Sequence, residues 1–220
     1  MGSRKRPVNS AVWAKRAKDA GIDLSDVLFQ NKKGMYEALD EIGLPRPKTL
    51  FYPAAECDKH RREIKEFIEK YGPVFSRLNP LDASDVRPYK MFIKSLQEFL
   101  DFVSNSKVNL AKYEVHIVEN GNVGYAGSIV SDKRLVGELS RGSQIDLFQG
   151  WVTPMTAMFD ELRRRFVFMN DEGYGPEEKE ILLKAIRMIK DHKGYFEFFV
   201  LDSGKILFKN FQTRGGFARI

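Results

Sequence analysis

One cysteine, Cys57, stands alone among 220 residues. A single thiol excludes an internal disulfide framework, and with the nearby His60 it supplies too few ligands for a structural zinc ion, which takes four. Uninterrupted apolar runs are also short, and none approaches the roughly 18 residues that a membrane helix needs. The basic N-terminus lacks the apolar stretch of a signal peptide. We therefore expect a soluble protein without a membrane partner, located in the cytoplasm.

Several binding motifs are missing as well. The chain has no GxxxxGK[ST] phosphate loop, no RNA-binding signature with stacked aromatic residues and no clear helix-turn-helix. Lys and Arg outnumber Asp and Glu by 36 to 30, a net charge of +6, and the basic residues gather near the N-terminus and at Arg163–Arg165. We interpret both groups as solvated surface. Binding of nucleic acid through them is the alternative, and its affinity would fall steeply with salt.

Helical spacing and turn signals give the two halves of the chain different characters. The first half alternates helices with short strands, whereas the second half has strand-like alternation, one helix and a closing pair of strands around Asp202–Gly204. Asn120-Gly121 is a hairpin signal within the alternating stretch. The predicted helices cover 11–20, 31–43, 58–72, 95–105 and 175–194, and a short strand covers 73–78.

This order of elements predicts an α+β protein with two lobes. We expect a basic helical segment over residues 1–30, a first lobe over 31–112 and a second lobe over 113–220.

Two residues of the predicted first lobe suit an anion. Lys33 precedes Gly34 at a helix start, where an ammonium can lie beside exposed backbone N–H groups and hold a phosphate. Arg77 ends an apolar strand, and a guanidinium there can bind phosphate oxygens through two parallel hydrogen bonds. The alternatives are an exposed lysine and an ion pair at the strand end.

The closing strands carry the second group of candidates. Strand alternation puts Tyr195, Glu197 and Phe199 on one face, and a buried Glu197 needs a cation or a donor nearby. Gln212 offers an amide oxygen, which together with one carboxylate and phosphate oxygens suits magnesium. Arg214 can neutralise a phosphoryl group during transfer. The alternative is an edge strand on which Glu197 faces solvent and pairs with Arg214.

These candidates occur in an order that resembles one known family. The segment "FEFFVLDSGKILFKNFQTR" is similar to the ending "IEFaid.dGkiyiLQtRP" of the nucleotide-binding domain of phosphoenolpyruvate synthase and pyruvate phosphate dikinase. The opening around Lys33-Gly34, the strand and loop "PVFSRLNPLDAS" and the segment "GELSRGSQIDLFQGWVTP" resemble further motifs of that domain. The likeness covers residues from about 30 to 214.

The resemblance implies an ATP-grasp fold, with mixed or antiparallel sheets and flanking helices, that holds ATP and Mg²⁺ between two lobes. By the same likeness, Lys33 and Arg77 contact phosphates. Glu197 and Gln212 hold the metal, and Arg214 lies at the phosphoryl group that is transferred.

The resemblance also bears on a sixth residue and on the reaction. Glu138 falls in the family's glycine-rich GE segment and is a further candidate for nucleotide binding. None of the three histidines carries the family's phosphohistidine motif, so an ATP-dependent phosphotransferase of this kind needs a separate phosphohistidine-type domain or a small-molecule acceptor. A non-catalytic nucleotide-binding or partner module is the alternative.

Overall fold

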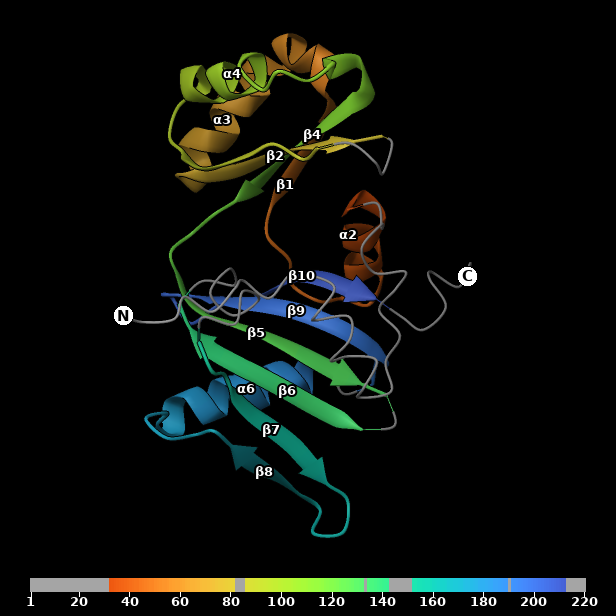
Figure 1. The fold of residues 1–220 in the computed structure, drawn as a ribbon, viewed down its shortest axis with the longest axis vertical. Coiled ribbons are helices and arrows are strands. Elements are labelled where there is room, and N and C mark those ends of the chain that lie inside the picture. Colours follow the sequence, from red (N-terminus) through yellow and green to blue (C-terminus); the bar gives the residue numbers. More distant parts are fainter. Residues whose placement is uncertain (1–31, 82–85, 133, 143–151, 190, 213–220) are drawn as a thin grey trace, which may run out of the picture. The chain divides into compact units, whose positions relative to one another are not determined.

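The computed structural model describes residues 32–81, 86–132, 134–142, 152–189 and 191–212. These residues form two units: residues 47–122 make up one, and the described residues before and after that range make up the other. Each unit has its own antiparallel sheet (Figure 1). The predicted basic helical segment over residues 1–30 lies outside the described residues.

The unit over residues 47–122 is built on a four-stranded sheet with the strand order β1-β4-β2-β3. Helices α3 and α4 lie together on one face of this sheet (Figure 1). In chain order its elements are β1 (Thr49–Pro53), η2 (Ala54–His60), α3 (Arg61–Tyr71), β2 (Val74–Pro80), β3 (Tyr89–Ile93), α4 (Leu96–Ser104), η3 (Leu110–Lys112) and β4 (Tyr113–Glu119).

Alternation along the strands creates the core of this unit. Val74 and Leu78 of β2 are buried, and they lie in one hydrophobic cluster with Ile64 of α3 and Phe99 of α4. Helix α3 ends where Gly72 takes a positive φ of 74°, a conformation that glycine adopts without strain. Phe75 and Arg77 alternate with the buried residues of β2 and therefore belong to the opposite face of the sheet.

The second unit is built on a six-stranded sheet with the strand order β10-β9-β5-β6-β7-β8. Consecutive strands pair in an antiparallel manner throughout. Its elements are α2 (Lys32–Glu41), β5 (Val123–Ser131), β6 (Leu135–Arg141), β7 (Met155–Asp160), β8 (Arg165–Met169), α6 (Pro176–Met188), β9 (Gly194–Leu201) and β10 (Ile206–Gln212).

Helix α6 covers one face of the six-stranded sheet (Figure 1). A Cβ atom at Gly137 of β6 would lie 3.0 Å from Leu182 and Ile186 of α6, so the glycine sets how closely the helix approaches the strand. Since neighbouring side chains point to opposite faces, Glu138 lies on the face away from α6. Helix α2 packs against β10 at the edge of the sheet.

The hairpin predicted at Asn120-Gly121 is wrong. Strand β4 ends at Glu119 and pairs with β1 and β2, whereas β5 begins at Val123 and pairs with β6 and β9. The dipeptide therefore connects two sheets instead of two partners. A turn signal reports only local backbone preference, and β4 has partners on both sides within its own sheet.

The division between the two units also differs from the predicted boundary between residues 112 and 113. Strand β4 belongs with residues 47–122 because both of its neighbours are there, and α2 belongs with the six-stranded sheet because it packs on β10. The sequence pattern marks elements, but it does not mark which sheet each strand joins.

The closing hairpin is confirmed. Strands β9 and β10 pair in an antiparallel manner, and the turn between them closes with the N–H of Gly204 donating to the carbonyl of Leu201 over 2.7 Å. The predicted helices over 31–43, 58–72, 95–105 and 175–194 are present with shorter bounds. Among the described residues, no helix is long and apolar enough to cross a membrane.

Candidate functional site

Polar side chains form a row across the six-stranded sheet, on the face away from α6. The register pairs Ser128 of β5 with Glu138 of β6 on one side and with Glu197 of β9 on the other. Glu197 in turn pairs with Asn210 of β10, and Glu138 with Thr156 of β7. Directly paired residues share one face of a sheet. Five adjacent strands thus contribute two carboxylates, two hydroxyls and one amide to a single line.

The two carboxylates of this row are close enough to act on one ligand. Glu138 and Glu197 are separated by one strand, which places their Cα atoms about 10 Å apart at the usual strand spacing. Both side chains are half-buried, while Ser128 and Asn210 are 4% and 7% exposed. The structure therefore brings together the predicted residues Glu138 and Glu197, which the sequence places 59 positions apart.

Tyr195 fixes the orientation of Glu197. Its hydroxyl donates to Oε1 of Glu197 over 3.0 Å, from the same strand and the same face. Burial raises the pKa of Tyr195 well above its ordinary value, and the negative charges of Glu197 and Glu138 raise it further. The hydroxyl therefore stays protonated at neutral pH and remains a donor to the carboxylate.

Asn210 belongs to this row although it is not among the residues predicted from the sequence. Gln212 is the last residue of β10 and pairs with Tyr195, whereas Asn210 pairs with Glu197 itself. A register shift between Phe208 and Asn210 interrupts the alternation of β10. Counting every second residue along the strand therefore assigns Asn210 to the wrong face. The signal that could have found it is its two-residue spacing from Gln212, since such residues share a face.

A magnesium ion fits the chemistry of these donors. Magnesium prefers carboxylate and carbonyl oxygens and usually keeps several ligands from water and phosphate. Glu197 and Asn210 supply one carboxylate and one amide oxygen side by side, and Glu138 supplies a second carboxylate in the same row. Among the described residues, no three His, Cys, Asp or Glu side chains gather around a point. A metal here therefore needs amide or ligand oxygens as well.

Arg77 lies in the other unit. It pairs with His116 of β4 and Tyr89 of β3, on the face of the four-stranded sheet that is opposite α3 and α4. His116 pairs with Phe51 of β1 and stacks on its ring, with centroids 4.4 Å apart and planes 4° apart. A half-buried guanidinium beside stacked rings can bind an anion. Arg77 lies in a strand as predicted, but in the middle of β2 and not at its end, and its role remains a prediction.

The structure describes the remaining two candidates in part or not at all. Lys33 lies in the first turn of α2, and the described structure does not extend to its side chain. The same holds for the side chain of Gln212, whose backbone completes β10. Arg214 lies outside the described residues. The convergence of Glu197, Gln212 and Arg214 therefore stays a prediction, and the register shows only that Gln212 pairs with Tyr195, two residues from Glu197 on β9.

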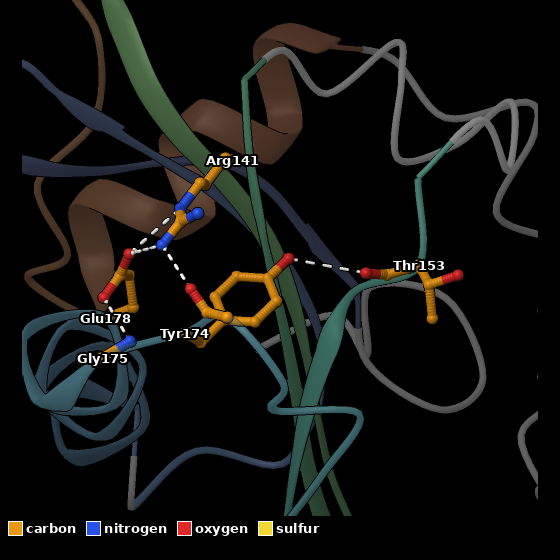
Figure 2. A network of polar contacts seen from close by, with 6 residues as sticks. Arg141, Thr153, Tyr174, Gly175 and Glu178 are labelled. Carbon is orange, nitrogen blue, oxygen red and sulfur yellow. Dashed lines mark hydrogen bonds and ion pairs between the residues drawn. The ribbon is translucent and has the colours of Figure 1, made fainter.

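A second polar network ties the end of β6 to the start of α6 (Figure 2). Arg141 donates through Nε to Glu178 over 3.0 Å and through Nη2 to the carbonyl of Gly173 over 2.7 Å. The other oxygen of Glu178 accepts the N–H of Gly175 over 2.8 Å, and Arg141 also lies over the ring of Tyr174. Hydrogen bonds from Arg141 lower the pKa of Glu178. This network holds segment 171–175 against the sheet.

Similar solved structures are ligases. The D-alanine–D-alanine ligase from Coxiella burnetii has a TM-score of 0.50 at 12% identity, over 100% of this chain and 58% of that one. The D-alanyl-alanine synthetase A from Vibrio cholerae has a TM-score of 0.49 at 12% identity, over 95% and 64%. A Chryseobacterium gregarium RiPP-associated ATP-grasp ligase, solved with ADP and a leader and core peptide, has a TM-score of 0.44 at 12% identity, over 82% and 51%.

These likenesses concern the fold. The chain spans between about half and two thirds of the length of these three proteins. No protein-family model matches the chain, and no curated protein matches it. The chain has the α+β, ATP-grasp-type fold that the sequence predicts, with antiparallel sheets and flanking helices. None of the three structures is a phosphoenolpyruvate synthase, so that finer resemblance stays a prediction.

Proposed function

We propose that this chain binds ATP with Mg²⁺ and that the γ-phosphoryl group of the bound ATP passes to a separate acceptor. The observation that supports this most directly is the pairing of Asn210 with Glu197, in one row with Ser128 and Glu138. Such a row on an ATP-grasp-type sheet offers hard oxygen ligands where a metal-bound triphosphate needs them.

Each residue has a distinct task in this proposal. Glu197 and Asn210 hold Mg²⁺, with Gln212 as a further ligand, and Tyr195 orients the Glu197 carboxylate by its hydrogen bond. Glu138 adds a second carboxylate on the metal side. Magnesium, when bound, neutralises charge on the phosphate oxygens and aligns them for displacement.

The cationic residues complete the charge balance. Arg77 and Lys33 contact phosphates, and Arg214 lies at the phosphoryl group in transfer; these three assignments rest on the sequence resemblance. An oxygen or a histidine nitrogen of the acceptor forms a bond to the γ-phosphorus, and the bond from that phosphorus to the β–γ bridging oxygen breaks, so that ADP leaves with the electron pair. Positioning and electrostatics account for catalysis of such a step.

The identity of the acceptor separates two kinds of enzyme. A carboxylate acceptor gives an acyl phosphate, which an amine can attack with release of phosphate. That is ligase chemistry, and the names of the similar structures describe ligases. A small molecule or the histidine of a separate domain as acceptor gives a phosphotransferase related to phosphoenolpyruvate synthase, as the closing sequence motif suggests.

Thermal melting tests the proposed site. ATP with Mg²⁺ at about 100 times the dissociation constant stabilises a binding protein by roughly 2.7 kcal/mol. We expect a clear upward shift with ATP and Mg²⁺ together and a smaller one with ATP alone. The magnesium-dependent part disappears in Glu197→Gln and falls in Asn210→Ala, whereas Glu180→Gln, an equal charge change on α6, leaves it intact.

The outcomes separate the parts of the proposal. No shift with ATP and Mg²⁺ in the wild-type chain overturns nucleotide binding. A full magnesium-dependent shift in Glu197→Gln overturns the metal site while leaving nucleotide binding in place. Binding without release of ADP, when carboxylate or histidine acceptors are supplied, identifies a non-catalytic nucleotide-binding module.

A further inference from the structure

The two edge strands of the six-stranded sheet differ in whether another part of the chain covers them. Beside β10, the carbonyl of Pro45 accepts the N–H of Phe208 over 2.7 Å, and α2 packs against the same strand. Strand β8 forms the other edge and has no neighbour on its outer side among the described strands (Figure 1). A bare edge presents a row of backbone donors and acceptors that can pair with another chain.

Apolar side chains accompany this bare edge. Leu162 at the β7–β8 turn is 97% exposed, Met169 at the end of β8 is 41% exposed, and Phe159 of β7 is 36% exposed. Phe159 packs edge-on against Phe166 of β8, with ring centroids 5.3 Å apart. The sequence of β8 itself, "RFVFM", is rich in β-forming residues. The hairpin therefore carries more exposed apolar surface than its position at a sheet edge needs.

Charges of opposite sign flank the strand on its two sides. Arg163, Arg164 and Arg165 precede or begin β8, and Asp171 and Glu172 follow it. Among the described residues, Arg164 and Glu172 take part in no ion pair.

The ends of the strand are also symmetric. The residues that stop β8, Arg164 and Asn170, both have positive φ, 50° and 53°. Each lies three positions from Val167, so the strand has a central residue with matching ends.

We propose that β8 is a homodimer edge: two copies of this chain pair their β8 strands in an antiparallel manner about a two-fold axis at Val167. This inference does not depend on the proposed function. In an antiparallel pair, two facing residues turn their backbone groups either both toward the partner strand or both away from it, and these two kinds of pair alternate along the strand. A two-fold axis therefore passes through a residue, and only an axis at Val167 pairs all five residues of β8.

This register makes the flanking charges complementary. Arg165 faces Met169 of the second copy, and Phe166 faces Phe168. Arg163 and Asp171 lie just beyond the two ends of the paired strands, so the turn of one copy comes beside the acidic segment of the other. The arginines of each copy thus approach the acids of the other, as an isologous interface requires. Aromatic pairs across strands add to the stability of such a sheet.

The acidic segment that follows β8 is held in place by contacts within its own chain. Lys179 pairs with Asp171 over 2.6 Å, and Arg141 binds the carbonyl of Gly173 (Figure 2). The hydroxyl of Tyr174 donates to the carbonyl of Thr153 over 3.5 Å. Segment 171–175 is thereby fixed beside the end of β8, which lowers the entropy lost on association.

The area of the contact predicts a weak dimer. Stable interfaces bury about 1,200–2,000 Å² in total, and a pair of five-residue strands alone buries less. The exposed side chains of the hairpin, Leu162, Phe159 and Met169, supply further area. We therefore expect a dimer with a dissociation constant roughly in the micromolar range.

Sedimentation velocity of the full chain over a wide concentration range tests this proposal. Substitutions at position 169 with opposite charges should change the dimer affinity in opposite directions, because this position faces Arg165 of the second copy. Met169→Lys creates like charges in both symmetric pairs and is expected to weaken dimerisation by roughly three- to tenfold. Met169→Glu creates opposite charges in both pairs and is expected to tighten it by a similar factor.

Two controls separate pairing from misfolding. Both variants lose the same apolar side chain, so a folding defect shifts both in one direction. Lys205→Glu, in the β9–β10 turn, changes net charge without touching β8 and should leave the dimer unchanged. A wild-type chain that is monomeric at every concentration overturns the proposal, and so does a dimer that both Met169 variants weaken equally.

Discussion

The two faces of the six-stranded sheet differ in composition: one is apolar and closely packed, and the other carries a row of polar side chains. The face under α6 is packed closely: Gly137 admits the helix, and Phe196, Phe198 and Phe208 are fully buried. The opposite face carries the polar row from Glu138 to Asn210. Burying polar groups is costly unless they are paired, so such a row is retained for hydrogen bonding or a ligand. One face supports the fold, and the other carries the residues of the proposed ligand site.

The largest effect is expected on the α6 face, at Gly127. A Cβ atom there would collide with the ring of Phe198 and with the backbone carbonyl of Glu138. The strand backbone cannot move away without breaking the register of β5 with both neighbours. We expect Gly127→Val to lower the free energy of unfolding by about 3 kcal/mol or more, measured by urea denaturation.

Gly34 in α2 provides the matched control for this substitution. No atom lies within 4 Å of a Cβ built at Gly34, so Gly34→Ala should be stabilising by about 0.5–1 kcal/mol in a helix. A loss below about 1 kcal/mol in Gly127→Val would mean that the α6 face is more loosely packed than the distances indicate.

The second effect tests how α6 is attached. Glu178→Gln removes the charge that Arg141 and the N–H of Gly175 share. We expect a loss of about 1–2 kcal/mol at pH 7, at the lower end because Arg141 is solvent-exposed and its pairing is screened. The control Glu180→Gln, which loses an exposed pair with Arg187, should cost less than about 0.5 kcal/mol.

The pH dependence of this difference has a definite sign. Arg141 lowers the pKa of Glu178 in the folded chain below 4.5, the value expected for the unfolded chain. The stabilisation is therefore complete above pH 4.5 and is lost as the pH falls through the folded pKa. Unfolding measured from pH 7 down to pH 3 should show the wild-type and Glu178→Gln curves converging. Parallel curves would contradict the assignment.

The sequence predicts the elements better than the pairing. The α3 helix, the β9–β10 hairpin and the face that Glu197 occupies follow from local spacing and turn residues, because these depend on neighbours along the chain. The pairing of β4 with β1 and β2 does not follow from local spacing, since Asn120-Gly121 favours a tight turn whether or not the flanking strands pair. Which sheet a strand joins is decided by contacts between residues far apart in sequence.

The candidate site shows the same limit. Glu197 and Gln212 could be found from alternation and resemblance, and Glu138 from resemblance alone. Asn210 follows only from its two-residue spacing from Gln212, because a register shift in β10 interrupts the alternation before it. Ser128 does not follow from any local pattern, because its place in the row depends on β5 lying between β6 and β9. A polar row across strands is a property of the sheet order, which no single segment contains.

The smallest effect on stability is expected on the polar face, at Tyr195. Tyr195→Phe keeps the buried ring and removes only the hydroxyl that donates to Glu197. The loss of unfolding free energy without ligand should be about 1 kcal/mol or less, the usual contribution of one hydrogen bond.

If Glu197 holds Mg²⁺, the same substitution also frees its carboxylate to rotate. The Mg²⁺ concentration at half-maximal ATP-dependent stabilisation should then rise several-fold, since partners that orient a metal ligand affect its affinity. The raised pKa of Tyr195 keeps the wild-type hydroxyl protonated, so the difference should be the same from pH 6 to pH 9. A variant that loses stability but keeps the wild-type magnesium midpoint would show that Tyr195 supports the sheet alone, and the functional difference between the two faces would then rest on Glu197 and Asn210 without it.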